Sequence, residues 1–450
     1  MIKKLKKNLR RLSIPQQIAI GFALTILVGA SLLTLPIATN SGESTNFLDA
    51  LFVATSAVCV TGQTTVNTAA HWNYFGRTVI ISLIEIGGLG FMSIIVYFFV
   101  FLGKKMTLRQ RMLLQETVGT ENAVDAQRMI RYIVRFALFV QTLGAGILAL
   151  DFIPRYGTLK GIYFSFFHSI SAFNNAGFDL FGNSLEGFVT NPLVILTIGG
   201  LIFFGGLGFI VWRDLLTYRK NKRLLIHTRI TLITTCSILI VSFLLFWISE
   251  TKHGTFAGLS TPDQITNVLF LAITPRTAGY ANVNYAFLSP MGIFLTLLLM
   301  FIGASSGSTG GGAKVTTFAT LFLYLRGQLT DTQPNFKGRA IGVDKIVKAI
   351  MILIIGLGMV TVASMILFVT ETIPPQFGIE YILMEVFSCF GTVGLTMGLT
   401  PDLTAIGKVV LIIVMFAGRI GLLTFFLSLG NHPESREPHI RYPEANILVG

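Results

Sequence analysis

Charged residues are scarce in this chain. Only 12% of its 450 residues are Asp, Glu, Lys or Arg, whereas 52% are hydrophobic. Soluble domains carry about 25% charged residues, so the chain has too little polar surface to cover a water-soluble globule. Its mean hydropathy of +0.72 supports the same conclusion. The composition excludes a soluble protein and predicts an integral membrane protein.

Cysteine is also rare. Cys59, Cys236 and Cys389 each lie in an apolar context without paired spacing, which gives neither a disulfide framework nor a metal motif. An intramembrane enzyme would need a metal set or a nucleophile with its base. The chain has no HExxH motif and no cluster of carboxylates in its apolar stretches. We predict that it is not an enzyme and holds no cofactor.

Basic residues outnumber acidic ones, and the formal net charge is +13. The basic clusters lie beside apolar stretches, at 3–11, 104–135, 213–229 and 326–348. The alternate loops are acidic and contain one lysine, Lys252; they are 38–46, 179–191, 249–266 and 370–380. The positive-inside rule places the basic loops in the cytoplasm. Both termini are then cytoplasmic, the number of crossings is even, and nucleic acid is not an expected partner.

Eight hydrophobic stretches are long enough to span a bilayer, which needs about 20 apolar residues. They are 17–36, 76–102, 130–152, 192–213, 229–249, 289–325, 346–370 and 403–429. Eight crossings agree with the charge pattern. The sequence therefore predicts an all-α, multi-pass protein of the cell membrane, surrounded by lipid.

Four shorter apolar segments lie between these stretches, and each ends in small or hydroxylic residues and a glycine. They read ALFVATSAVCVTGQT (50–64), YFSFFHSISAFNNAGFD (163–179), VLFLAITPRTAGY (268–280) and LMEVFSCFGTVGLT (383–396). Apolar runs of this length are typical of re-entrant helices. The sequence predicts four fused repeats, each with two spans and one pore loop, related by pseudo-fourfold symmetry. The expected boundaries are 1–102, 103–227, 228–330 and 331–450.

Each pore loop ends in a three-residue strand. The strands are Val60, Thr61 and Gly62; Asn175, Ala176 and Gly177; Thr277, Ala278 and Gly279; and Thr392, Val393 and Gly394. Glycine adopts backbone conformations that other residues avoid, so successive carbonyls can face one axis. A ring of carbonyls replaces the hydration shell of a cation. The four strands therefore predict a cation-selective filter.

The stretch GASSGSTGGG (303–312) interrupts the sixth apolar run. Five glycines in ten residues disfavour a helix, and non-helical backbone at membrane depth lies only against protein or a water-filled cavity. We predict a gate loop below the filter. Its residues are Gly303, Ser305, Ser306, Gly307, Ser308, Thr309, Gly310, Gly311, Gly312 and the following Lys314.

These motifs resemble the Trk, Ktr and HKT superfamily of potassium transporters. The similarity extends from about residue 15 to the C-terminus and is strongest to the Ktr membrane subunit. The stretches SAFNNAGF (171–178), TPRTAGY (274–280), FGTVGLTMGLTP (390–401) and GRIGLLTF (418–425) carry it. It implies potassium uptake, since glycine at all four filter positions, Gly62 included, accompanies potassium preference in that family. It also implies a homodimer and a cytoplasmic ring of nucleotide-binding regulatory subunits that control the gate loop.

Two buried cations leave alternatives open. Arg419 lies within the last apolar stretch, where a charge costs about 2.5–3.5 kcal/mol on insertion scales. It either faces the pore or pairs with a carboxylate, Glu85 or Glu385. The resemblance implies a place beneath the filter, as a barrier to permeation. Lys314 either locks the gate loop or extends toward the interface.

Other polar residues near the filter have two interpretations each. Asn174 and Asn175 either brace the second strand, which we favour, or bind the ion. We expect His168 and Cys389 to be packing residues. Arg276 either anchors the outer end of the third strand or faces water.

The resemblance implies potassium uptake down the electrochemical gradient, with potassium as the ion at the filter and sodium as a possible activator. The alternative is a sodium-coupled or sodium-selective transporter of the same superfamily. The loops are too short for nucleotide-binding domains, so any such regulator is a separate chain.

Overall fold

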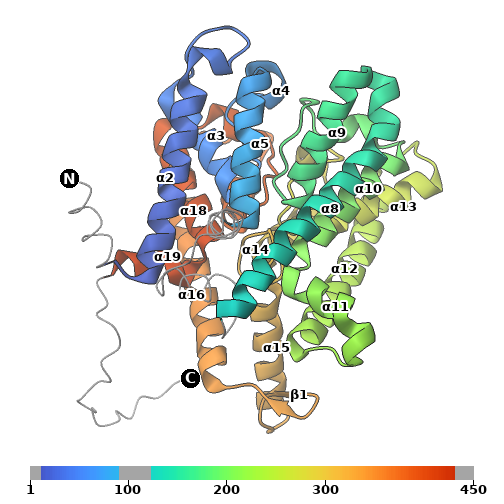
Figure 1. Ribbon diagram of the computed structural model, residues 1–450, viewed down its shortest axis with the longest axis vertical. Coiled ribbons are helices and arrows are strands. Elements are labelled where there is room, and N and C mark those ends of the chain that lie inside the picture. The colour runs from blue at the N-terminus through green and yellow to red at the C-terminus, as the bar shows by residue number, and fades with distance from the viewer. Residues whose placement is uncertain (1–11, 91–122, 431–450) are drawn as a thin grey trace.

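The computed structural model describes residues 12–90 and 123–430, and it is helical apart from one small pair of strands. Strands β1 (Asn335–Phe336) and β2 (Arg339–Ala340) pair antiparallel between two helices (Figure 1). The predicted all-α membrane fold is confirmed. Four predicted features lie outside the described residues: the basic N-terminus 1–11, the end of the span 76–102, most of the basic loop that follows it, and the tail 431–450.

Each repeat contains a long outer helix, a short helix and an inner helix. The outer helices are α2 (Ile14–Thr34), α8 (Ala123–Tyr156), α12 (Ile226–His253) and α16 (Val343–Thr370). The short helices are α3 (Phe47–Cys59), α9 (Thr158–Phe173), α13 (Thr261–Ile273) and α17 (Glu380–Gly391). The inner helices are α5 (Tyr74–Leu89), α10 (Pro192–Gly206), α14 (Pro290–Ile302) and α18 (Ala405–Ile420). Minor helices are η1 (Pro36–Ala38), α4 (Thr68–His71), η2 (Glu186–Phe188), η3 (Tyr285–Phe287) and η4 (Thr400–Asp402).

The four repeats close into a ring. The inner helix of each repeat packs against the short helix of the next, in the pairs α5 with α9, α10 with α13, α14 with α17 and α18 with α3. The last pair joins the C-terminal repeat to the N-terminal one, and Figure 1 shows α18 beside α3. All four short helices therefore surround one region.

Four outer helices are long and apolar enough to cross a membrane, and two bent helix pairs raise this number to six among the described residues. The predicted continuity of the spans 192–213 and 403–429 was wrong. Helix α10 meets α11 (Phe209–Asn221) at 92°, and α18 meets α19 (Leu422–Leu429) at 110°. Gly208 and Gly421 lie at these bends with φ of +98° and +97°. An α-helix requires a negative φ, so the helix ends at each of these glycines.

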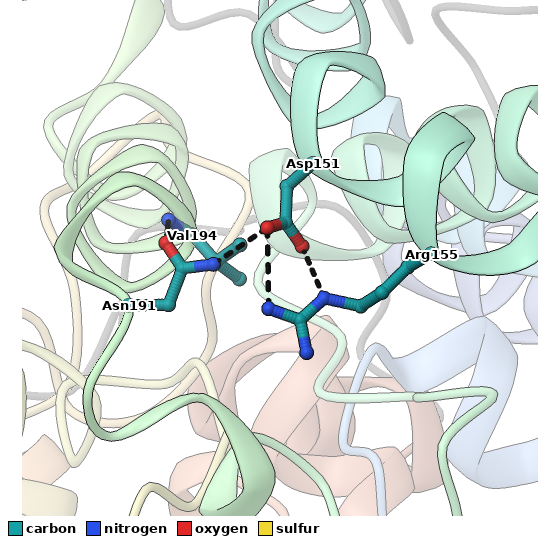
Figure 2. A network of polar contacts seen from close by, with 4 residues as sticks. All are labelled: Asp151, Arg155, Asn191 and Val194. Carbon is teal, nitrogen blue, oxygen red and sulfur yellow. Dashed lines mark hydrogen bonds and ion pairs between the residues drawn. The ribbon is translucent and has the colours of Figure 1, made fainter.

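In each repeat, hydrogen bonds connect the C-terminal end of the outer helix, or the residues just after it, to the N-terminus of the inner helix. In the second repeat, Figure 2 shows Asp151 of α8 between the Asn191 amide and the Arg155 guanidinium. Asn191 Nδ2 donates to Asp151 Oδ1 at 2.7 Å, and Arg155 Nε donates to Asp151 Oδ2 at 2.8 Å. Asn191 Oδ1 also accepts from the Val194 N–H at 3.3 Å and caps α10.

The same connection recurs in the other repeats with different residues. The equivalent contacts are Asn73 Nδ2 to the Ile37 carbonyl at 2.7 Å, Ser289 Oγ to Glu250 at 2.6 Å and Thr404 Oγ1 to Glu371 at 2.6 Å. Each donor is the N-cap residue of its inner helix. These contacts fix the frame that holds the short helices.

Candidate functional site

Each short helix ends at the three-residue strand predicted from the sequence. The first residue of every strand has a positive φ: +59° at Val60, +59° at Asn175, +79° at Thr277 and +50° at Thr392. The glycines follow at +97° for Gly62, +67° for Gly177, +75° for Gly279 and +98° for Gly394. Positive φ is uncommon for residues with side chains, above all β-branched ones. The same rare backbone therefore occurs four times.

Hydroxyl residues on the short helices hold the strands from behind. In the first repeat, the Thr61 N–H donates to the Ser56 carbonyl at 2.8 Å, and the Gly62 N–H donates to Ser56 Oγ at 3.0 Å. Ser388 makes the same two contacts with Val393 and Gly394, at 2.8 and 2.9 Å. These amides point away from the centre, which leaves the intervening carbonyls free to face it.

The second and third repeats use the hydroxyl differently. Ser171 Oγ donates to the Phe178 carbonyl at 2.9 Å, and Thr274 Oγ1 donates to the Tyr280 carbonyl at 2.6 Å. Hydroxylic residues are visible in all four segments, but the sequence alone assigns no role to these four. A hydroxyl five or six residues before each glycine is the signal that identifies them.

The four strands surround a single axis. A methyl group placed on each glycine would lie less than 3.0 Å from a carbonyl oxygen of the next strand. The pairs are Gly62 with Ala176, Gly177 with Ala278, Gly279 with Val393, and Gly394 with Thr61. Because the fourth strand contacts the first, the contacts form a closed circle. Only glycine allows this approach.

A hollow of about 530 Å³ opens on the side of the circle where the chain leaves the four strands. All four glycines line it, together with residues that follow each strand. Asp179 and Glu186 are the only charged residues in its lining among the described residues, and both are acidic. Burial raises the pKa of Glu186 above its ordinary value. The C-terminal ends of the short helices, which carry partial negative charge, also point toward this region. The hollow is therefore suited to cations.

The predicted gate loop separates α14 from α15 (Val315–Leu329) and lies against the second repeat. Thr309 Oγ1 donates to the Phe173 carbonyl at 3.1 Å, and the Ser305 N–H donates to the Gly206 carbonyl at 3.1 Å. The Phe209 N–H donates to the Gly307 carbonyl at 2.9 Å. The loop is thus bonded to both sides of the bend between α10 and α11.

The loop also contacts the inner end of the strands. A methyl group on Gly310 would lie less than 3.0 Å from the Thr277 hydroxyl, and one on Gly311 would lie equally close to the Thr392 hydroxyl. Lys314 Nζ donates to the carbonyls of Gly310 and Gly311 at 2.6 and 3.1 Å. Lys314 therefore bonds the loop that it follows.

The remaining loop residues hold its shape. Gly303, Gly307 and Gly312 have φ of +71°, +71° and +73°. Ser308 Oγ donates to the Ser305 carbonyl at 2.6 Å, and a hydrogen bond of 2.7 Å joins the hydroxyls of Ser306 and Thr316.

Arg419 reaches across from the fourth repeat. Its guanidinium donates to the carbonyls of Thr309 in the loop and Gly87 in α5, and to the Gly88 carbonyl at 3.1 Å. Of the two alternatives left open by the sequence, pairing with Glu85 or Glu385 is not observed, because the partners of the guanidinium are backbone carbonyls. Carbonyls in the last turn of a helix have no intrahelical donor, so the end of α5 supplies acceptors instead of a side chain.

The two candidate carboxylates have other partners. Glu85 accepts from Gln141 Nε2 at 2.9 Å and from Asn174 Nδ2 at 2.6 Å. Glu385 accepts from Gln63 Nε2 at 2.5 Å. Each is held by amide donors.

The asparagines and His168 bond protein groups around the second strand. The Asn175 amide, oriented to satisfy its neighbours, donates to the carbonyls of Ala172 and Ile202 at 3.2 and 3.1 Å and accepts from Thr277 Oγ1 at 3.1 Å. Asn174 donates to Glu85. His168 stacks on Phe181, and its Nε2 accepts from the Leu180 N–H at 3.1 Å. His168 therefore both packs and fixes the chain beyond the strand.

Arg276 differs from both expectations. Its side chain is buried, with the residue 8% exposed, so it does not face water. It lines a small cavity with Thr235, Ile273 and Ala304, close to the gate loop instead of the outer mouth. Its position three residues before Gly279 places it at the inner end of the strand.

The described residues offer no group of three or more His, Cys, Asp and Glu side chains that could hold a metal ion. Residues 303–307 read GASSG, the GxSxG spacing of many hydrolase nucleophiles. However, they follow helix α14 and not a strand, and Ser305 Oγ has no hydrogen-bond partner among the described residues.

Comparisons with known proteins agree with this architecture. Residues 3–436 match the model of the TrkH family, described as cation transport protein. The chain is 48% identical to the potassium/sodium uptake protein NtpJ of Enterococcus hirae, over 99% of both chains. It is 41% identical to the Ktr system potassium uptake protein B of Bacillus subtilis, over 98% of this chain and 97% of that one.

A solved structure shares the fold. The potassium transporter TrkH from Vibrio parahaemolyticus superposes with a TM-score of 0.69 at 20% identity, over 92% of this chain and 84% of that chain.

Proposed function

The chain belongs to the TrkH family of cation transport proteins, within the Trk and Ktr superfamily, and on this basis we propose that it takes up potassium across the cell membrane. Its family and relatives are transporters and not enzymes. The membrane potential supplies about 2.3 kcal/mol per charge for each 100 mV. That suffices to accumulate potassium without ATP hydrolysis.

The closed circle of carbonyls around the four glycines is the observation that carries the proposal. The twelve strand residues would bind the ion through carbonyls, with Thr61, Ala176, Ala278 and Val393 as the oxygens nearest the glycines. Each ion would exchange water for these oxygens. The acidic hollow would concentrate cations at the entrance.

The gate is proposed to be the loop 303–312, held closed from three sides. The bend in the second repeat, Lys314 and Arg419 each bond the loop. The loop contacts the threonines at the inner end of the filter, so an ion leaving the filter would meet it. Arg419 would add an electrostatic barrier at the same level.

A separate regulatory ring is proposed to release the loop. Relatives named as Ktr system proteins B and D support a Ktr-type assembly. We propose a homodimer, a cytoplasmic ring of nucleotide-binding subunits and cytoplasmic termini.

A second candidate is uptake of both potassium and sodium. The relative with 48% identity is named a potassium/sodium uptake protein, and sodium could be transported or could act as an activator. The purified chain in liposomes, assayed for isotope uptake of potassium, rubidium and sodium with and without a regulatory ring, separates these functions. Potassium and rubidium uptake with little sodium uptake supports the first, and equal uptake of all three contradicts it.

A further inference from the structure

A buried carboxylate joins the first and fourth repeats behind the proposed filter. Glu385 of α17 is fully buried and accepts from Gln63 Nε2 at 2.5 Å, from Thr400 Oγ1 at 2.9 Å and from the Thr396 hydroxyl. Cys389 Sγ donates to Gln63 Oε1 at 2.6 Å. The two repeats are more than 300 residues apart in sequence, and this network closes the seam between them.

The donors lie directly beyond the filter. Gln63 follows Gly62, and Thr396 lies two residues after Gly394. One carboxylate therefore fixes the chain as it leaves two neighbouring strands. Glu385 forms no ion pair among the described residues, so hydrogen-bond donors alone hold its carboxyl group. Because these donors are buried, removing their acceptor leaves them without a hydrogen-bond partner and destabilises the folded state.

The seams between repeats are not equivalent. Between the third and second repeats, Tyr280 Oη donates to the Phe178 carbonyl at 2.8 Å. Tyr280 and Gln63 occupy the same position, directly after a filter glycine. The corresponding residues of the other two repeats, Phe178 and Leu395, are apolar and buried. The residue directly after the filter glycine is thus polar and bonded across a seam in the first and third repeats, and apolar in the second and fourth.

The carboxylate is found in one repeat only. The residue nine positions before the glycine is Glu385 in the fourth repeat, and it is Val53, His168 and Phe270 in the others. Fourfold symmetry does not require an acid here. Its presence at one seam points to a specific role at that seam.

We propose that Glu385 and Gln63 are positioning residues that set the ion selectivity of the filter by holding the first and fourth strands at a fixed separation. This inference rests on the proposed function. Neither side chain touches the ion; both act through the carbonyls of Thr61 and Val393. A looser seam lets the oxygens approach a smaller ion and reduces discrimination between potassium and sodium.

The test measures the ratio of potassium to sodium flux through the full-length protein in liposomes. Glu385→Gln places an amide opposite the Gln63 amide, and Gln63→Leu removes the brace while keeping the carboxylate. Each should lower the flux ratio about tenfold, the size expected when a buried hydrogen-bonding group loses its partner. The double variant Q63E/E385Q exchanges donor and acceptor and should restore the ratio.

Glu250→Gln is the matched control. Glu250 is equally buried and accepts from three hydroxyls, those of Ser249, Thr255 and Ser289, but it lies between α12 and α14. It should leave the ratio unchanged.

The outcomes separate the two proposals. A parent protein with a flux ratio near one refutes potassium selectivity itself. If the parent protein is selective and the folded single variants are equally selective, the positioning role of Glu385 and Gln63 is overturned, and potassium selectivity is not. Should Glu385→Gln fail to fold, Gln63→Leu still decides, because an unchanged ratio in this folded variant contradicts the proposal.

Discussion

Gly311→Ala is expected to open the proposed gate. The added methyl group would lie 2.8 Å from Thr392 Cγ2 and 3.1 Å from Thr392 Cβ, and closer still to the hydroxyl. Ordinary contacts begin near 3.4 Å, and no rotation of the threonine side chain moves its Cβ away. The loop or the filter must therefore shift by several tenths of an ångström.

The gate loop is held less firmly than the filter strand. The filter strand is held by two hydrogen bonds to Ser388, at 2.8 and 2.9 Å. The Gly311 carbonyl, in contrast, accepts from the Ala304 N–H at 3.4 Å and from Lys314 at 3.1 Å. Overpacking costs about 1–3 kcal/mol. Because the open state lacks this contact, the open population should rise about 5- to 150-fold.

Rubidium influx into liposomes containing the purified chain, without any regulator, measures this effect. Gly358→Ala in α16 is the control, since its added methyl group would have no described neighbour within 4 Å. Influx should rise in Gly311→Ala and stay at the parental level in Gly358→Ala. A folded Gly311→Ala protein with unchanged or lower influx would refute the reasoning.

Four further predictions follow from the same contacts. Arg419→Gln removes charge-assisted hydrogen bonds to the loop and α5, so rubidium influx should increase about tenfold or more. The size-exclusion profile should stay the same, and loss of assembled protein would contradict a permeation role. Deleting part of 304–311 should raise regulator-free influx, and retention of normal regulated flux would argue against the gate. Gly62→Ala forces a methyl group onto the Ala176 carbonyl and should abolish selective uptake in a protein that still inserts; parental selectivity would exclude the filter geometry. Because burial raises the pKa of both Asp179 and Glu186, these acids lose their charge in milder acid than usual, so uptake should fall on mild acidification, and Glu186→Gln should reduce that pH dependence.

The repeats were predictable because their signals are local. An apolar run followed by hydroxyls and glycine describes a short helix and its left-handed end, and both occur within about fifteen residues, as in 50–64. The interruption at 303–312 was equally visible, since consecutive glycines oppose a helix wherever they stand. The all-α fold followed from composition and span length.

Other features depended on contacts between repeats. Gly208 and Gly421 sit in apolar runs that continue beyond them, so the length of the runs did not indicate the bends of 92° and 110°. The partners of Arg419 are backbone carbonyls, which every residue has, so no pattern in the sequence could point to Gly87 or Thr309. A sequence pattern can indicate side-chain partners such as carboxylates, but it cannot indicate which backbone carbonyls are free.

Anomalous diffraction from rubidium in crystals of the full-length protein would locate the bound ion. We expect a peak on the axis, equidistant from the carbonyl oxygens of Thr61, Ala176, Ala278 and Val393. Rubidium bound elsewhere, with no peak inside this circle, would contradict it.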